Sequence, residues 1–345
     1  MNMEFDPNGV GVDNGNYYGL PFTVDDARLV LVEVPWDVTV SYGEGAADAP
    51  MSVRRASTQL DLYDSQYPDV WRAGIAAVPA GGALREESRR WREEAREVIG
   101  ALERGESLKS VMPAVGRINA ACEHMNGTVY DTCSRLLAEG KIVGLVGGDH
   151  STPYGLVKAL AGRETDFGIL HFDAHCDLRE AYEGFEYSHA SIMYNILRDV
   201  PQVSRIVEVG VRDYCDSEAA MAAASPRIAM FNGVELARRS FEGESWASQC
   251  DRIIGSLPGT VYVSFDIDAL DVQYCPHTGT PVAGGLTFDR AAYLLKRLCD
   301  SGKRIIGFDM VEVVPSHDAP IDQMVGARIL YKLCLMTLAA EIRRE

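Results

Sequence analysis

Histidine and aspartate side chains recur at short spacings in three separate segments of the chain. These segments are Gly147-Gly148-Asp149-His150-Ser151, Asp173-Ala174-His175-Cys176-Asp177 and Asp266-Ile267-Asp268-Ala269-Leu270-Asp271, and Glu312 follows a fourth apolar run. Carboxylates and imidazoles without clustered thiolates are ligands for hard or borderline divalent ions, Mn²⁺ first and then Ni²⁺, Co²⁺ or Zn²⁺. Several carboxylates gathered at one place repel one another unless cations lie between them. The spacing therefore predicts a pair of divalent metal ions.

A binuclear centre of this kind would perform hydrolysis. Two metal ions bridged by carboxylates activate water at neutral pH and polarise an electrophile. Two divalent ions contribute +4, four aspartates −4 and a hydroxide −1, so the site is anionic even before Glu312 is counted. Such a site suits attack on a cation, for example a guanidinium carbon, better than attack on a phosphate ester.

Each segment alone also has an ordinary structural explanation. A Gly-Gly-Asp-His sequence is usually a turn, and Asp-x-Asp after a strand is common at helix caps, where it satisfies free N–H groups. Asp149 and Asp271 are expected to orient ligands or hold turns. Cys176 points away from the metals if its segment is extended. The joint occurrence of the segments at strand ends favours the metal site.

The segments follow apolar runs of strand length. The expected strands are 29–34, 73–78, 142–146, 167–172, 206–211, 228–231, 261–265 and 305–311, and helices are expected over 86–104, 118–139, 291–299 and 329–342. Most of the runs are continuous rather than alternating, as in strands covered on both faces. The alternation of strand and helix predicts one parallel sheet wrapped by helices. Ligands bind outside the carboxyl ends of such strands, where the polar segments lie.

The rest of the chain predicts a single catalytic domain over 29–345. Residues 1–28 are rich in turn formers and form an arm that packs on the domain or on a neighbouring subunit. There is no internal repeat, no low-complexity segment and no linker with a composition shift.

Composition excludes several classes of protein. The formal charge of −17 makes nucleic-acid binding improbable. No apolar run is long enough to span a membrane, and the first residues do not form a secretory signal. The 8 cysteines are scattered without any C-x-x-C pair, as in reduced proteins of the cytoplasm, so we expect a cytoplasmic protein.

Five segments in order resemble the ureohydrolase family, which includes arginases, agmatinases, formiminoglutamases and hydrolases of guanidine or guanidino acids. They are GGDHS at 147–151, HFDAHCD at 171–177, SFDIDALD at 264–271, TGTPVAGGLT at 278–287 and FDMVEVVP at 308–315. The resemblance covers nearly the whole chain from Leu29 onward. It implies the arginase-like fold, a three-layer α/β/α domain with a mainly parallel eight-stranded sheet, in trimers or hexamers.

The resemblance also assigns roles to individual residues. His150, Asp173, Asp177 and Asp266 would hold one metal, and Asp173, His175, Asp266 and Asp268 the other. Glu312 would pair with the substrate guanidinium, a charge-assisted contact. His189 would carry a proton to the leaving amine, although the start of a helix is the ordinary interpretation of its position.

The segments that set the substrate differ from those of arginases. The stretch between Asp177 and His189 is acidic and aromatic, as in agmatinases, and Cys215 stands where arginases have the aspartate that holds the α-amino group. Arginine is therefore disfavoured, and agmatine, free guanidine, alkylated guanidines or biguanides are expected. Substrate contacts are expected from Glu183, Trp36, Thr280 and His277, with Glu186 at the mouth. Tyr17, Tyr18 and Tyr42 could join Trp36 in an aromatic cage, or could be ordinary core or subunit contacts.

Two alternatives remain open. A formiminoglutamase or guanidino-acid hydrolase would need a cation for the substrate carboxylate, and Arg179 and Arg212 are the nearby candidates. A silent subunit of a hetero-oligomer is the other alternative, and the retained ligand set, His189 and Glu312 argue against it.

Overall fold

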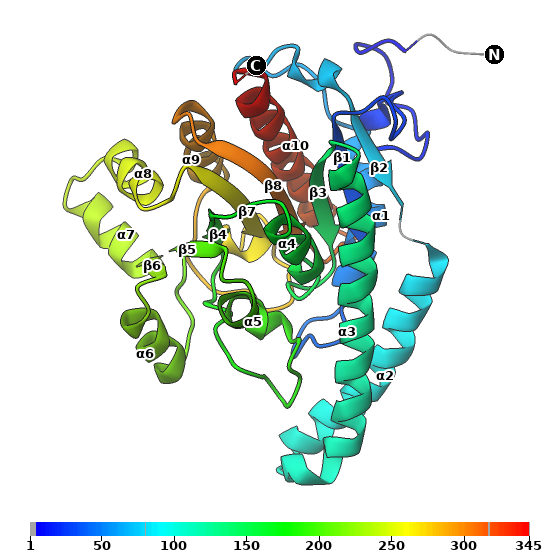
Figure 1. The fold of residues 1–345 in the computed structure, drawn as a ribbon, viewed down its shortest axis with the longest axis vertical. Coiled ribbons are helices and arrows are strands. Elements are labelled where there is room, and N and C mark those ends of the chain that lie inside the picture. The colour runs from blue at the N-terminus through cyan, green and yellow to red at the C-terminus, as the bar shows by residue number, and fades with distance from the viewer. Residues whose placement is uncertain (1–4, 80, 317, 345) are drawn as a thin grey trace.

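The computed structural model describes residues 5–79, 81–316 and 318–344, and it consists of one sheet between two layers of helices (Figure 1). All eight strands are parallel, in the order β2-β1-β3-β8-β7-β4-β5-β6. This confirms the predicted three-layer α/β/α architecture. The strands are β1 Leu29–Val34, β2 Ile75–Val78, β3 Ile142–Gly147, β4 Phe167–Phe172, β5 Val203–Val209, β6 Ile228–Phe231, β7 Thr260–Asp266 and β8 Arg304–Val311.

The helices fall into two groups according to the face of the sheet that they cover. One core contains side chains of α1 Ala49–Ser57, α7 Gly233–Phe241, α8 Trp246–Gly255, α9 Phe288–Asp300 and α10 Ile321–Ile342. The other contains side chains of α2 Gly82–Glu103, α3 Leu108–Ala138, α4 Tyr154–Ala161 and α5 Ile192–Asp199, with α6 Asp216–Ala224 at its border. Both faces of the strands are therefore buried, which explains their continuous apolar runs.

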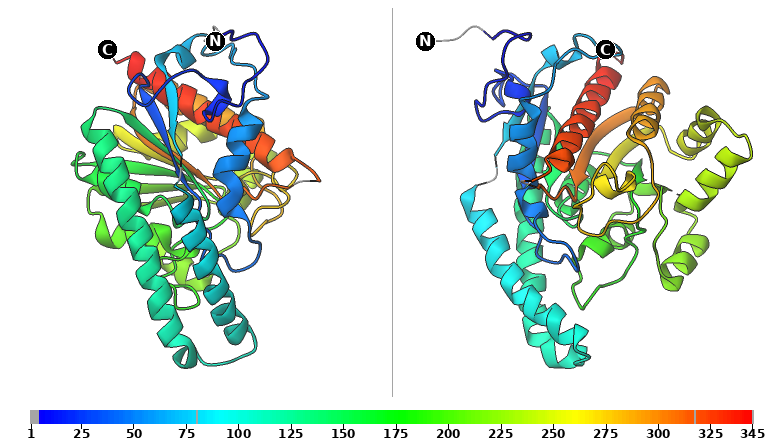
Figure 2. Two further views of the ribbon diagram at one scale, coloured as in Figure 1. Left: turned by 90° about the vertical axis from the view of Figure 1, so that its right-hand side faces the viewer. Right: turned by 180° about the vertical axis from the view of Figure 1, so that it is seen from behind.

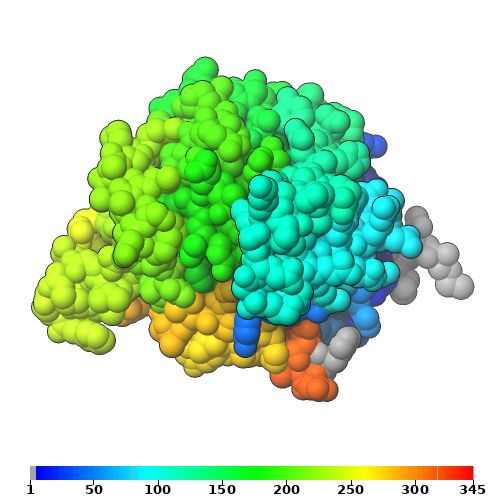
Figure 3. All heavy atoms as spheres, turned by 90° about the horizontal axis from the view of Figure 1, so that it is seen from below, coloured from blue at the N-terminus to red at the C-terminus, as the bar shows by residue number. Residues whose placement is uncertain are grey.

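The hairpin formed by α2 and α3 projects beyond the sheet (Figure 2). Its lower part lies against the segment between β4 and α5. There Asn119 Nδ2 donates to the carbonyl of Gly184, and Asn119 Oδ1 accepts the backbone N–H of Glu186. Figure 3 looks at this end of the molecule and shows the hairpin in cyan beside the green segment. The hairpin thus borders the loops at the carboxyl ends of the strands.

The described part of the N-terminal arm, residues 5–28, lies against the domain. Tyr17 and Tyr18 are buried, the Tyr17 hydroxyl donates to Glu33 at 3.1 Å, and the Tyr18 ring packs on Tyr331. No helix among the described residues is both long and apolar enough to cross a bilayer.

Candidate metal and substrate site

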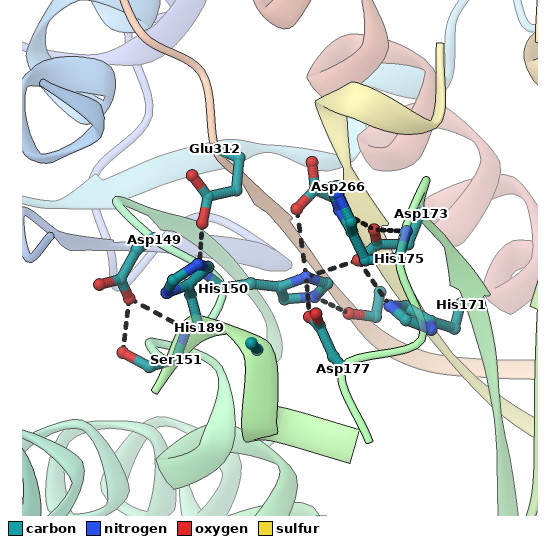
Figure 4. A network of polar contacts seen from close by, with 12 residues as sticks. Asp149, His150, Ser151, His171, Asp173, His175, Asp177, His189, Asp266 and Glu312 are labelled. Carbon is teal, nitrogen blue, oxygen red and sulfur yellow. Dashed lines mark hydrogen bonds and ion pairs between the residues drawn. The ribbon is translucent and has the colours of Figure 1, made fainter. Parts of the chain in front are cut away.

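Four neighbouring strands deliver the polar segments to one place. β3, β8, β7 and β4 are adjacent in the sheet. His150, Glu312 and Asp173 follow the ends of β3, β8 and β4, and Asp266 is the last residue of β7. Because all four strands are parallel, their carboxyl ends meet at the same edge. Figure 4 shows the side chains converging there.

His150 lies at the centre of the first cluster. Its Nδ1 atom is 2.9 Å from Asp173 Oδ2, 3.0 Å from Asp177 Oδ2 and 3.2 Å from Asp266 Oδ2. All four side chains are buried. One ring nitrogen carries at most one hydrogen, so it cannot satisfy three carboxylate oxygens. A shared cation would satisfy all of them.

A second cluster shares Asp173 with the first. His175 Nδ1 lies 3.3 Å from Asp173 Oδ1 and 3.1 Å from Asp268 Oδ2. Asp173 therefore presents one oxygen to each cluster. The six residues that we expected as metal ligands are thus brought together, in two groups that meet at Asp173.

The electrostatics of the clusters fit divalent cations. Burial, followed by the Asp173 carboxylate, raises the pKa of Asp177 to about 6. Burial and the neighbouring Asp268 and Asp173 raise the pKa of Asp266 well above its usual value. Carboxylates held this close resist ionisation unless positive charge lies between them. Carboxylate and imidazole donors are of the types that Mn²⁺ and Ni²⁺ bind.

Glu312 is aimed at the clusters by an unusual backbone conformation. Its φ is 62°, a left-handed value that is costly for a residue with a Cβ. Its Oε1 atom accepts the backbone N–H of His150 at 2.8 Å, and Thr278 donates to its carbonyl at 2.8 Å. A Cβ on Gly279 would come within 3.2 Å of Oε2, so that position favours glycine. These contacts hold the buried carboxylate beside the first cluster.

His189 stands at the edge of the same site. Its backbone N–H donates to Thr39 Oγ1 at 3.2 Å, its Nε2 lies 3.5 Å from Ser41 Oγ, and the Tyr182 ring stands edge-on to it. Burial, followed by the nearby His175, lowers the pKa of His189 to about 3. The shift favours the neutral form of the ring.

Asp149 and Asp271 make local contacts instead of facing the clusters. Asp149 accepts the backbone N–H of Ser151 at 3.0 Å and the hydroxyl of Thr39 at 3.3 Å. Asp271 accepts the backbone N–H of Gln273 at 3.1 Å. Asp149 thus holds the turn that carries His150, and Asp271 holds a turn just after Asp268.

A cavity of about 450 Å³ opens onto His175, Asp177 and His189. Its other lining residues come from the loops after β1, β4, β5 and β7 and from α6, and include Ser41, Tyr42, Arg179, Tyr182, Asp213, Tyr214, Glu218 and Thr280. Its walls are therefore aromatic and acidic.

Only some of the expected substrate contacts line this cavity. Thr280 and Tyr42 do, whereas the Trp36 side chain is fully buried in the core. Glu183 lies in a tight turn closed by Tyr182 and Phe185, with Arg92 and Glu103 of α2 nearby. His277 Nδ1 pairs with Asp322 at 2.8 Å.

The two arginines near the site have different surroundings. Arg212 donates to five backbone carbonyls, those of Gly210, Asp268, Leu270, Val282 and Ala283. It is therefore committed to holding the loop that follows Asp268. Arg179 lines the cavity, where it stacks on Tyr182 at 4.6 Å and lies 3.8 Å from Glu218.

The structure adds His171, Thr39 and Ser264 to the surroundings of the clusters. His171 Nε2 lies 2.9 Å from Asp173 Oδ2, and Ser264 Oγ lies 2.9 Å from His150 Nε2. His171 and Ser264 each stand two residues before a ligand, so strand alternation puts them on the ligand's face. That signal was available in the sequence, whereas Thr39 comes from the loop after β1, far along the chain, and carries none.

Comparisons with known proteins agree with this geometry. Residues 27–336 match the arginase family. The chain is 30% identical over 308 residues to the N(1)-aminopropylagmatine ureohydrolase of Thermus thermophilus, covering 89% of each protein. It is 30% identical to the agmatinase of Neisseria meningitidis, covering 89% of this chain and 86% of that protein. The agmatine ureohydrolase structure from Thermoplasma volcanium aligns with a TM-score of 0.70, at 24% identity, over 94% of each chain.

The chain belongs to the arginase family. It is a ureohydrolase, an enzyme that cleaves a C–N bond of a guanidino compound. Enzymes of the family depend on two metal ions, and this chain has the histidine and aspartate cluster for binding them.

Proposed function

We propose that the enzyme uses two divalent ions, Mn²⁺ or Ni²⁺, to hydrolyse a small cationic guanidino compound. The candidates are free guanidine, an alkylated guanidine, a biguanide and agmatine. The products are urea or a substituted urea, and an amine or ammonia. The observation that carries this proposal is the anionic cavity that leads to the two clusters beside the buried Glu312.

In the proposed reaction, the metal pair supplies Lewis acidity and activates water at neutral pH. His150, Asp173, Asp177 and Asp266 would hold one ion, and Asp173, His175, Asp266 and Asp268 the other. The Glu312 carboxylate binds the guanidinium and orients its carbon toward the clusters. His189, at the edge of the clusters, would pass the proton released by the attacking water to the departing amine.

The cavity argues against a guanidino acid as substrate. Among its described lining residues, Arg179 alone carries a permanent positive charge, and Glu218 and Tyr182 already engage it. A substrate carboxylate would have to compete with Glu218. Asp213 and the tyrosines favour a cationic or neutral distal group instead.

A panel assay tests the proposal. Urea and ammonia release is measured after separate loading with Mn²⁺ or Ni²⁺. The substrates are agmatine, guanidine, methylguanidines, metformin, guanidinobutyrate and arginine. We expect turnover of at least one cationic compound and little turnover of guanidinobutyrate. A profile limited to arginine or guanidinobutyrate would contradict the substrate class, and no turnover with either metal would favour a silent subunit.

We also propose that the chain forms a homotrimer or homohexamer in the cytoplasm. The support is the family resemblance together with the 8 cysteines, all of which are free thiols in the structure. Light scattering after size exclusion would measure the mass, and a monomer would contradict the proposed assembly.

A further inference from the structure

A row of polar side chains crosses the sheet directly beneath the metal clusters. Asp309 on β8 is the register partner of Ser264 on β7, Ser264 is the partner of His171 on β4, and His171 is the partner of Glu208 on β5. Register partners on adjacent strands point to the same face of a sheet. All four residues are buried, with at most 1% exposed. Four polar side chains in one buried layer are costly unless they are paired.

One half of the row is fully paired and supports His150. Ser264 Oγ lies 2.9 Å from His150 Nε2 and donates to Asp309 Oδ1 at 3.2 Å. The hydroxyl of Tyr262 donates to Asp309 Oδ2 at 2.7 Å. This series of hydrogen bonds fixes the His150 ring so that Nδ1 faces the carboxylates of the first cluster.

The other half reaches Asp173 through His171. His171 Nε2 lies 2.9 Å from Asp173 Oδ2, the oxygen that also faces His150 (Figure 4). His171 Nδ1 and both carboxylate oxygens of Glu208 are buried without a hydrogen-bond partner. On the far side of Glu208, its register partner on β6 is Met230, whose side chain has no N–H or O–H donor. His171 and Glu208 are register partners on strands about 4.8 Å apart, so the Glu208 carboxyl and His171 Nδ1 can pair with each other.

We propose that Glu208 is a positioning residue that acts through His171 on Asp173, the aspartate shared by the two clusters. A hydrogen bond between the Glu208 carboxyl and His171 Nδ1, direct or through one water, pairs Nδ1 with one of the two carboxyl oxygens, whichever group carries the proton. It holds the His171 ring with Nε2–H directed at Asp173 Oδ2. Asp173 then keeps the orientation in which it faces both His150 and His175. This inference rests on the proposed function, because it concerns a ligand of the proposed metal pair.

The consequence is a change in metal affinity that packing alone would not produce. Removing a partner that orients a metal ligand typically weakens metal binding by about 10- to 100-fold. Glu208→Leu removes the carboxyl and retains an apolar side chain, whereas Glu208→Gln retains both an acceptor and a donor. Val207 precedes Glu208 on β5, is fully buried and packs on the opposite face, so Val207→Ala is the matched control.

The experiment is titration of the metal-free full-length chain and its variants with Mn²⁺. Calorimetry gives the dissociation constant and the EPR signal of free Mn²⁺ gives an independent one. We expect Glu208→Leu to bind about 10- to 100-fold more weakly, and Glu208→Gln to bind within about threefold of the parent. Val207→Ala should melt at a lower temperature and bind Mn²⁺ as the parent does.

A double-mutant cycle keeps the route through His171 testable. His171→Phe alone should weaken Mn²⁺ binding to a similar extent, which also serves if Glu208→Leu does not fold. Adding Glu208→Leu to His171→Phe should cause no further loss. Parent-like affinity in Glu208→Leu or in His171→Phe, or a full further loss in the double variant, would overturn the inference. If the parent chain itself binds no Mn²⁺ or Ni²⁺, the proposed metal centre and this inference both fail.

Discussion

Replacing Glu312 with glutamine separates the charge of this side chain from its shape. Glu312 Oε1 accepts the His150 backbone N–H at 2.8 Å, and the amide oxygen of glutamine can accept the same bond. The turn that carries His150 should therefore survive, and with it the metal clusters. The variant loses only the negative charge that we assign to guanidinium binding.

The size of the effect follows from the burial of this carboxylate, which is 5% exposed. Opposite charges at about 4 Å attract by about 4 kcal/mol at an effective dielectric constant of about 20. A neutral hydrogen bond from glutamine recovers about 1 kcal/mol. The net loss of about 3 kcal/mol corresponds to a fall of about 100-fold in kcat/KM.

The assay is urea release by the metal-loaded enzyme, with bound metal measured on the same sample. Glu123→Gln, at an exposed position on α3, makes the same change in net charge and serves as the control. We expect Glu312→Gln to retain two metal ions and lose activity. A kcat/KM within threefold of the parent would refute the assigned role, and metal loss would show that Glu312 acts through His150 instead.

Three further changes test other parts of the account. Asp266→Asn should abolish binding of the metal pair and activity; elemental analysis showing two ions with normal turnover would contradict this. Burial raises the pKa of Glu183 to about 7, so the folded chain holds a proton that the unfolded chain releases above about pH 4.5. The free energy of unfolding should therefore fall as pH rises from about 4.5 to 7. Because the Glu183 site is partly exposed, Glu183→Gln should raise the free energy of unfolding in urea by about 1 kcal/mol at pH 8 and leave it unchanged at pH 4. An equal effect at the two pH values would contradict the raised pKa of Glu183. Arg212→Met should lower the free energy of unfolding by about 2–4 kcal/mol, because it leaves the carbonyls of Asp268 and Leu270 without their arginine partner. An unchanged urea midpoint would contradict the role of Arg212 in holding this loop.

The sheet could be predicted from the sequence because its strands are continuous apolar runs of strand length. The apolar runs at 29–34, 167–172 and 228–231 coincide with β1, β4 and β6 residue for residue, and the other five strands lie within three residues of their predicted places. Short buried helices gave no comparable signal. α4 Tyr154–Ala161 is apolar on most of its surface, so it lacks the polar stripe that marks an amphipathic helix.

The candidate site was predictable where ligands follow strands and unpredictable where loops fold back. His150, Asp173 and Asp266 are placed by the strands before them, so parallel topology brings them together. Trp36 also follows a strand, but the chain turns its ring into the core. His277 is paired with Asp322, a partner far along the chain that local sequence does not reveal. In the sequence, Glu208 is a single polar residue within an apolar run, and only the strand register places it beside His171.

The most direct test of the central claim is a metal titration coupled to urea release. The metal-free chain is titrated with Mn²⁺ or Ni²⁺ in the presence of a cationic guanidine that the panel assay identifies. We predict saturation at two ions per chain, with activity that develops as the pair forms. Saturation at one ion, or two bound ions with no urea released from any cationic guanidine, would contradict the account.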